Sequence, residues 1–264
     1  MNTANAFQAR IIGGIKVHID KEKWKFIASM KWDNNHYCGA SLISERWVLT
    51  AAHCWFNTNS EPYEILAEDR IALGSYNLNL QTDYKIKSLV IHPDYDHDTF
   101  DSDLAIFELK TPVDGIQPAI LDRSTPLEGG LESWVAGWGI TGHETVQDDL
   151  PVDLIEVMVP IMSKEACDDI YGTSITSSMF CAGYVDTRRD ACYGDSGGPL
   201  IIYKNGHWVQ LAVVSWGTRC GETGYAGVYT HLQKFIPWIE TYTGALASFT
   251  DTNITPIIST YLLN

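Results

Sequence analysis

Residues 190–199 read DACYGDSGGP, and this stretch decides how the rest of the chain is interpreted. It places Ser196 between an aspartate and two glycines. A serine hydroxyl is a poor nucleophile at its own pKa, so it needs a base and an acid that orients the base. The sequence offers both, because His53 stands next to a cysteine and Asp103 opens an apolar run. The pattern predicts that Ser196 is an acyl-transfer nucleophile.

The chain order His53, Asp103, Ser196 resembles that of the chymotrypsin-type serine peptidases. Further motifs follow in the order of that family: IIGG at 11–14, WVAGWG at 134–139, FCAGY at 180–184 and SWG at 215–217. The resemblance implies an all-β fold of two packed six-stranded antiparallel β-barrels with a short C-terminal helix. Alternating strands such as 210–214 agree with an all-β body.

The resemblance divides the chain into three parts. These are an activation peptide at 1–10, a trypsin-like peptidase domain of two barrels at 11–244, and a C-terminal extension or linker at 245–264. Residues 232–243 resemble the closing helix of the family, and Gly244 is a typical helix end. The last part turns from polar to apolar, a pattern suited to a linker that leads into a strand.

Composition excludes several other classes of protein. The chain has 264 residues, 45% of them apolar, which suffices for a sizeable core. No stretch approaches the roughly 18 apolar residues of a membrane helix, and residues 1–10 lack the apolar middle of a secretory signal. The net charge of −15 repels nucleic acid and weakly favours cationic peptides, or simply keeps a secreted protein soluble.

Six cysteines allow fifteen pairings, and the sequence alone does not choose among them. The resemblance implies Cys38–Cys54, Cys167–Cys181 and Cys192–Cys220. Such bridges predict an oxidising compartment, which means secretion, or the periplasm of a bacterium. A metal site is not expected, because the cysteines lack closely spaced pairs and no histidine cluster accompanies them.

The resemblance assigns a role to each of the three polar residues. His53 takes the proton of Ser196 during attack and later gives it to the leaving amine, while Asp103 holds the imidazole tautomer. Asp101 is a rival for the acid, but the apolar run directly after Asp103 matches the family. The other seven histidines have no matching context, and no chemistry is assigned to them.

The residues beside the nucleophile have implied roles as well. The backbone N–H groups of Gly194 and Ser196 are expected to form the oxyanion hole. Asp195 needs a partner for its charge when it is buried. In the family, cleavage after Arg10 frees the ammonium group of Ile11, which inserts and pairs with this aspartate. We therefore expect a zymogen that is nearly inactive before cleavage.

Asp190 lies where the family has the floor of the pocket for the side chain before the cut, and a negative floor selects Arg or Lys. The other expected substrate-binding positions are Ala191, Ser215, Trp216, Gly217 and Gly227. Trypsins often have serine at the position of Ala191, so a hydroxyl that helps to hold a lysine is missing. Arginine reaches a carboxylate bidentately without it, and we expect Arg to be preferred.

No cofactor and no metal are expected. The stretch 74–81 lacks the glutamates with which trypsins bind calcium. Expected partners are protein or peptide substrates with Arg or Lys before the cut, the chain itself through self-activation at Arg10, and protein protease inhibitors. Nucleic acid and a membrane span are not expected. The alternative function is that of a non-catalytic serine-peptidase homologue that acts as a binding module.

Overall fold

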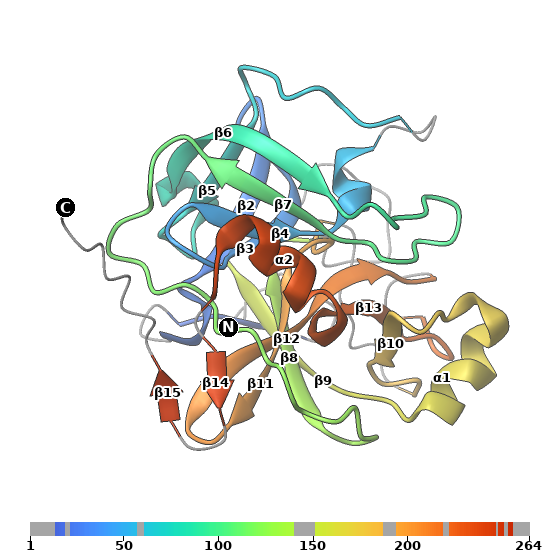
Figure 1. Cartoon of the computed structure of the whole chain (residues 1–264). Helices are drawn as coiled ribbons and strands as arrows, with labels where there is room; N and C mark the ends of the chain where they lie inside the picture. Colours follow the sequence, from blue (N-terminus) through green and yellow to red (C-terminus); the bar gives the residue numbers. More distant parts are fainter. Residues whose placement is uncertain are drawn as a thin grey trace, which may run out of the picture.

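Two sheets of antiparallel strands make up most of the regular structure. The computed structural model describes residues 14–18, 22–56, 61–139, 151–186, 194–218 and 222–246, together with the backbone of 248–250 and 253–255. In Figure 1 the first sheet lies in the upper half of the molecule and the second in the lower half. The expected all-β fold is confirmed.

The first sheet is a closed barrel with the strand order β2-β3-β4-β7-β6-β5. Its strands are β2 (Ile27–Trp32), β3 (Asn35–Leu42), β4 (Trp47–Thr50), β5 (Arg70–Leu73), β6 (Thr82–Ile91) and β7 (Ala105–Leu109). All neighbouring strands run antiparallel. Closure leaves no unpaired edge in this barrel.

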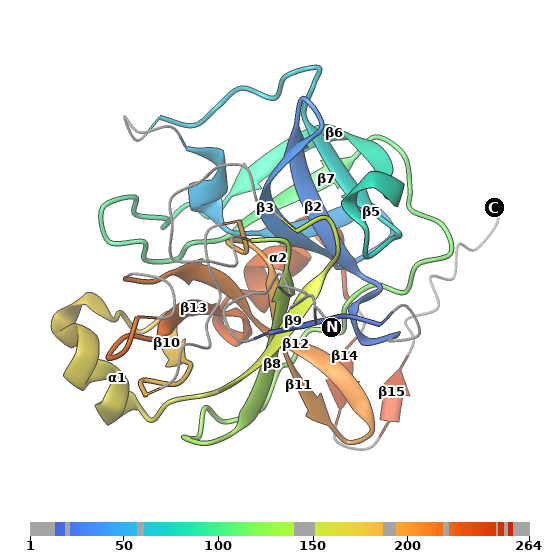
Figure 2. The same cartoon turned by 180° about the vertical axis from the view of Figure 1, so that it is seen from behind.

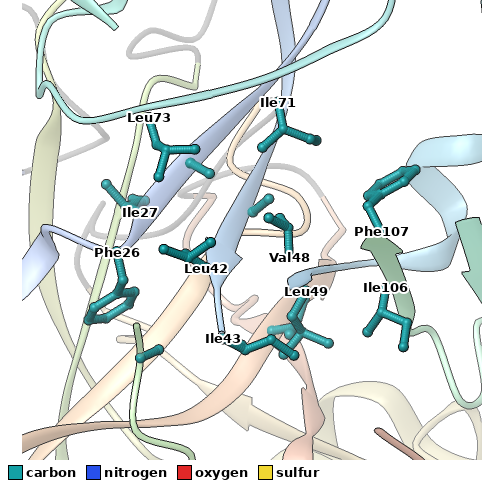
Figure 3. Packing of buried hydrophobic residues seen from close by; sticks show 14 of the residues in the cluster. Phe26, Ile27, Leu42, Ile43, Val48, Leu49, Ile71, Leu73, Ile106 and Phe107 are labelled. Carbon is teal, nitrogen blue, oxygen red and sulfur yellow. The ribbon is translucent and has the colours of Figure 1, made fainter. Parts of the chain in front are cut away.

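Aliphatic side chains from these strands meet inside the first barrel. Figure 3 shows Ile27, Leu42, Leu49 and Ile71 among the packed side chains, and each is 0% or 1% exposed. Complete burial of such a side chain contributes about 1.5–3 kcal/mol. This core fixes the positions of the strand ends, from which the polar residues of the site emerge.

The second sheet has the strand order β1-β9-β8-β11-β12-β13-β10. Its strands are β1 (Ile15–Lys16), β8 (Glu132–Gly137), β9 (Ile155–Pro160), β10 (Met179–Ala182), β11 (Pro199–Lys204), β12 (His207–Trp216) and β13 (Gly227–His231). An isolated bridge between Ile161 and Ala182 links the two ends of the six strands β8–β13, which correspond to the second barrel. Figure 2 shows β8, β9 and β11 from behind, below β2 and β3.

Two short α-helices accompany the barrels. Helix α1 (Lys164–Tyr171) begins at Ser163, whose hydroxyl caps the N–H of Ala166. Helix α2 (Ile236–Thr243) ends at Gly244, as expected. Five 3₁₀ turns complete the helical structure: η1 (Glu22–Trp24), η2 (Ala52–Trp55), η3 (Leu78–Leu80), η4 (Gly172–Ser174) and η5 (Leu232–Lys234). None of the helices in the described parts is long and apolar enough to cross a bilayer.

The end of the chain differs from expectation in two details. The closing helix was expected to be continuous over 232–243, but it breaks between η5 and α2. Pro237 explains the break, because it has no N–H to donate to the carbonyl of Gln233. Beyond Gly244, β14 (Ser248–Thr250) and β15 (Asn253–Thr255) pair with each other in a separate two-stranded sheet.

Disulfides tie one 3₁₀ turn and one α-helix to the barrels. Cys38 on β3 is bonded to Cys54 on η2, and Cys167 on α1 is bonded to Cys181 on β10. Two of the three expected pairings are therefore confirmed. The third, Cys192–Cys220, lies outside the described residues.

Candidate active site

Strands β4 and β7 bring His53 and Asp103 together. They pair through Thr50 and Ala105, so the residues that follow the first strand and precede the second lie side by side. His53 Nδ1 lies 2.8 Å from Asp103 Oδ2, and the His53 backbone N–H donates to Oδ1 at 2.9 Å. Because a carboxylate only accepts hydrogen bonds, Nδ1 carries the proton and Nε2 is left as the basic nitrogen.

The Asp103 side chain is completely buried, and hydrogen bonds surround it. The hydroxyl of Ser215 on β12 donates to Oδ2. Ser215 is the extra residue of a β-bulge between Val214 and Trp216, and a bulge re-aims a side chain. Sequence reasoning assigned Ser215 to the substrate strand and did not foresee this hydroxyl contact, because a bulge leaves no signal in the sequence.

Asp101, the rival acid, points elsewhere. Its carboxylate accepts hydrogen bonds from the hydroxyls of Thr176 and Ser178. Burial raises the pKa of Asp101, but hydrogen bonds from Ser178, Thr176 and Ser102 outweigh burial and leave it below its usual value. Neutral hydroxyl donors thus satisfy the Asp101 carboxylate, and His53 pairs with Asp103 instead.

The segment around Ser196 is held to both barrels by its backbone. The carbonyl oxygen of Ser196 accepts from the N–H of Gly39 on β3 at 2.7 Å, and Gly197 N–H donates to Val214 on β12 at 2.8 Å. These bonds place Ser196 in the cleft between the sheets. The disulfide lies beside it, with Cys54 Sγ 3.7 Å from the Ser196 carbonyl oxygen and 3.8 Å from His53 Nε2.

One cavity joins these groups. Its volume is ≈ 720 Å³, and His53, Ser196 and Gly194 all line it. Gly194 has φ = +96°, a left-handed conformation that favours glycine. Among the described residues, no backbone carbonyl accepts from the N–H of Gly194 or of Ser196. Two backbone donors without a backbone acceptor therefore lie beside a serine and a histidine.

His36 on β3 holds this segment from behind. Its Nε2 lies 2.9 Å from the carbonyl oxygen of Gly194, and its Nδ1 lies 2.7 Å from Ser29 Oγ. Burial lowers the pKa of His36 to about 4, although the bond to Gly194 opposes this shift and the charge of Lys31 adds to it. The imidazole is therefore neutral at pH 7. His36 belongs to no motif in the sequence, and only the fold places it behind Gly194.

Asp195 is completely buried. Its Oδ1 accepts from the N–H of Gly139 at 2.8 Å. A Cβ atom at Gly137 would stand 2.1 Å from that oxygen, so only glycine fits there. Ile11, the residue expected to pair with Asp195, lies outside the described residues, as does Arg10.

The expected substrate wall lies on β12 and β13. Trp216 pairs with Val228 and packs edge-on against Tyr171, with ring centroids 5.1 Å apart. An added Cβ at Gly217 would have its nearest neighbours at 3.8 Å, on Ala226 and Gly227. A side chain at this position would therefore be in ordinary van der Waals contact with the backbone at the start of β13. Asp190 and Ala191, the expected floor, lie outside the described residues.

The site has one group of potential metal ligands in the parts of the chain that are described. Ligand atoms of Cys38, His53 and Cys54 lie within 4.8 Å of one another. The two sulfur atoms are bonded to each other, so neither is a thiolate that could bind a metal. The group therefore does not fit a metal ion.

Comparison with known proteins adds independent findings. A trypsin family model matches residues 11–239 of the chain. Mouse Transmembrane protease serine 7 is 36% identical over 253 residues, covering 92% of this chain and 29% of that protein. The rat protein of the same name is 35% identical over 253 residues, again covering 92% of this chain and 29% of that protein. The chain thus spans less than a third of the length of these curated relatives.

Proposed function

Because the chain belongs to the trypsin family of serine proteases, we propose that it hydrolyses peptide bonds after arginine, and secondarily after lysine, through an acyl-enzyme on Ser196. The observation that carries this proposal is the 2.8 Å contact between His53 and a buried Asp103, where the same His53 lines a cavity together with Ser196. Serine proteases are hydrolases, and the proposed reaction is the hydrolysis of a peptide bond.

The reaction follows from the protonation of His53. Nε2 accepts the hydroxyl proton of Ser196 while Oγ attacks the carbonyl carbon of the substrate. The N–H groups of Gly194 and Ser196 stabilise the negative oxygen that forms, by about 3 kcal/mol for each donor. The imidazolium, stabilised by Asp103, then protonates the leaving amine. Water enters and attacks the ester carbonyl while Nε2 takes its proton. As the acyl C–O bond breaks, Nε2 gives this proton to Ser196 Oγ, and the acid product leaves.

The preference for arginine rests on sequence position. Asp190 supplies a carboxylate six residues before Ser196, and Gly217 brings no side chain of its own into the expected substrate wall. A guanidinium pairs with a carboxylate through two parallel hydrogen bonds, whereas an ammonium needs further acceptors. Ala191 supplies no such acceptor, so arginine is preferred over lysine.

The protein is proposed to be made as a zymogen and to act outside the cell, or in a periplasm if it is bacterial. Cleavage after Arg10 would free the ammonium group of Ile11, and the buried Asp195 is the partner for that charge. Two disulfides support an oxidising compartment.

Small anilide substrates test this function directly. Protein cleaved between Arg10 and Ile11 is expected to hydrolyse an arginine p-nitroanilide, and the lysine analogue more slowly. The uncleaved protein and a cleaved Ser196→Ala variant are the controls, and both are expected to be nearly inactive. A cleaved protein that binds peptides but hydrolyses neither anilide would instead be the non-catalytic homologue.

A further inference from the structure

The cavity at Ser196 continues along the first barrel, away from the proposed arginine pocket. Beyond His53, Gly194 and Ser196, the described lining residues come from β2, β3, η2 and the segment between η2 and β5, and they include Trp32, Trp55, Tyr63, Glu64 and Asp69. None of the lining residues comes from the β12–β13 wall, where the residues before the cut are proposed to bind. A substrate that passes Ser196 would therefore place the residues after the cut in this cavity.

Aromatic rings form its walls. Trp55 is 2% exposed and packs edge-on against Tyr63 and Phe107, so its position is fixed. Its indole N–H donates to the Tyr63 carbonyl oxygen at 2.6 Å. At the rim, Trp32 and Tyr63 are each 54% exposed. Aromatic rings attract cations through the negative charge on their faces, so this lining favours a cationic side chain over an anionic one.

A buried carboxylate lies in the same cavity. Asp69 is 6% exposed, and its Oδ2 accepts from the N–H of Leu66 at 2.6 Å. In the described parts of the chain, no lysine, arginine or histidine forms an ion pair with it. Arg70, the adjacent cation, instead donates to the backbone carbonyls of Ala67 and Asp69. Burial is the largest influence on the Asp69 carboxyl and raises its pKa.

A second carboxylate, that of the exposed Glu64, also lines the cavity. A buried carboxylate without a counter-ion is costly, and a cation that enters removes this cost. An anionic side chain would be repelled by both acids, and an apolar one would leave Asp69 unpaired. Charge thus distinguishes among the side chains that this cavity could take.

We propose that the cavity binds the side chain of an arginine or lysine among the first three residues after the cut, between the aromatic walls and against Asp69 and Glu64. This inference rests on the proposed function and names its substrate class: peptides with a basic residue on both sides of the cut.

The chain's own activation sequence does not meet this requirement. The residues after Arg10 are Ile11, Ile12, Gly13 and Gly14, none of them basic. Self-activation is therefore slow compared with cleavage of a preferred substrate.

The test uses peptides that share arginine before the cut and carry arginine or citrulline at one of the three positions after it. Citrulline has the same shape but no charge, so the ratio of kcat/KM for the pair isolates the charge. The ratio is expected to be about 10 at the preferred position, as for a charge-assisted hydrogen bond. A ratio near 1 at all three positions would overturn the inference.

Two variants locate the effect. Asp69→Asn and Glu64→Gln are each expected to lower the arginine-to-citrulline ratio at least about threefold. Because Glu64 is exposed, the Glu64→Gln variant is expected to fold even if Asp69→Asn, which changes a buried residue, does not. Turnover of the arginine anilide, which has no residues after the cut, shows whether each variant retains a working active site. Equal ratios in the parent and both variants would contradict the proposal.

A binding measurement separates this inference from the proposed function. A fluorescent peptide of only the residues after the cut is titrated into the Ser196→Ala protein, in arginine and citrulline versions. Tighter binding of the arginine version is expected even if the parent hydrolyses no anilide. Equal affinities would overturn the cavity assignment, whereas an inactive parent with selective binding would overturn only the proposed function.

Discussion

Ser215 Oγ donates a hydrogen bond to Asp103 Oδ2, the same carboxylate oxygen that lies 2.8 Å from His53 Nδ1. Ser215, on β12 of the second sheet, thus holds Asp103, which lies just before β7 of the first barrel. Without this hydroxyl the carboxylate would be held by the two donors of His53, the backbone N–H and Nδ1. The hydroxyl adds a donor from the second sheet and so fixes the orientation of the carboxylate and, through it, of the imidazole.

Replacement of Ser215 by alanine is expected to lower kcat about tenfold with a smaller change in KM, because a hydrogen bond to a charged group contributes about 1.5–3 kcal/mol. The matched control is Thr230→Val. The Thr230 hydroxyl donates to the backbone oxygen of Asp103 at 3.1 Å and not to its carboxylate. Kinetics on an arginine anilide measure both variants. A larger loss of kcat in Thr230→Val than in Ser215→Ala would contradict this role.

Stability is expected to depend on two buried histidines. Burial is the main cause that lowers the pKa of His36 and of His231 to about 4. Their unfolded-state pKa is about 6.5. The unfolded chain therefore binds more protons between pH 6.5 and 4, and the free energy of unfolding falls as the pH falls through this range. Each histidine accounts for up to about 3 kcal/mol of that loss.

His36→Gln tests this dependence, because glutamine keeps an N–H donor but does not titrate in this range. Denaturant unfolding at several pH values is the measurement. The variant is expected to lose less stability than the parent between pH 6.5 and 4. Parallel curves for the two proteins would show that His36 contributes nothing to acid sensitivity.

Lys23 is expected to stabilise the contact between the N-terminal segment and the second sheet. Its Nζ lies 2.7 Å from Glu156 Oε2 and 3.9 Å from the centroid of the Trp134 ring. The side chains of this ion pair are 8% and 4% exposed. Removal of one partner from a buried pair costs about 3–5 kcal/mol, and we expect a loss of this size in Lys23→Met.

Lys16→Met is the control for this prediction. Lys16 pairs with Asp153 at 2.5 Å, but the side chains of that pair are 64% and 34% exposed. Solvent screens such a pair, so a loss of less than about 1 kcal/mol is expected. Chemical denaturation compares the two variants, and equal losses would refute the stated importance of burial.

The fold was predicted from the resemblance of short motifs, such as WVAGWG at 134–139 and FCAGY at 180–184, to those of a known family, and each of these motifs is a local pattern. The break before α2 also has a local cause, which is Pro237. The apolar run after Asp103 favoured it over Asp101 as the acid. The structure gives the physical reason, because the hydroxyls of Thr176 and Ser178 donate hydrogen bonds to the Asp101 carboxylate.

Other parts of the candidate site depend on contacts between segments that are distant in the sequence, and no local pattern predicts these contacts. His36 lies behind Gly194 only because β3 packs against the segment that carries Ser196. The Ser215 hydroxyl faces Asp103 through a bulge. The cavity proposed to bind a basic side chain is lined by residues from two strands, a turn and a loop. Asp69, its buried carboxylate, lies in a stretch of sequence whose acidic residues show no motif.

Mass spectrometry of the Arg10-cleaved protein after treatment with a serine-directed organophosphonate tests the central claim, which is that His53 activates Ser196. The account predicts one covalent adduct, located on Ser196, that forms rapidly in the parent and very slowly in a His53→Ala variant. An adduct on another residue, no adduct at all, or equal rates in the two proteins would contradict it.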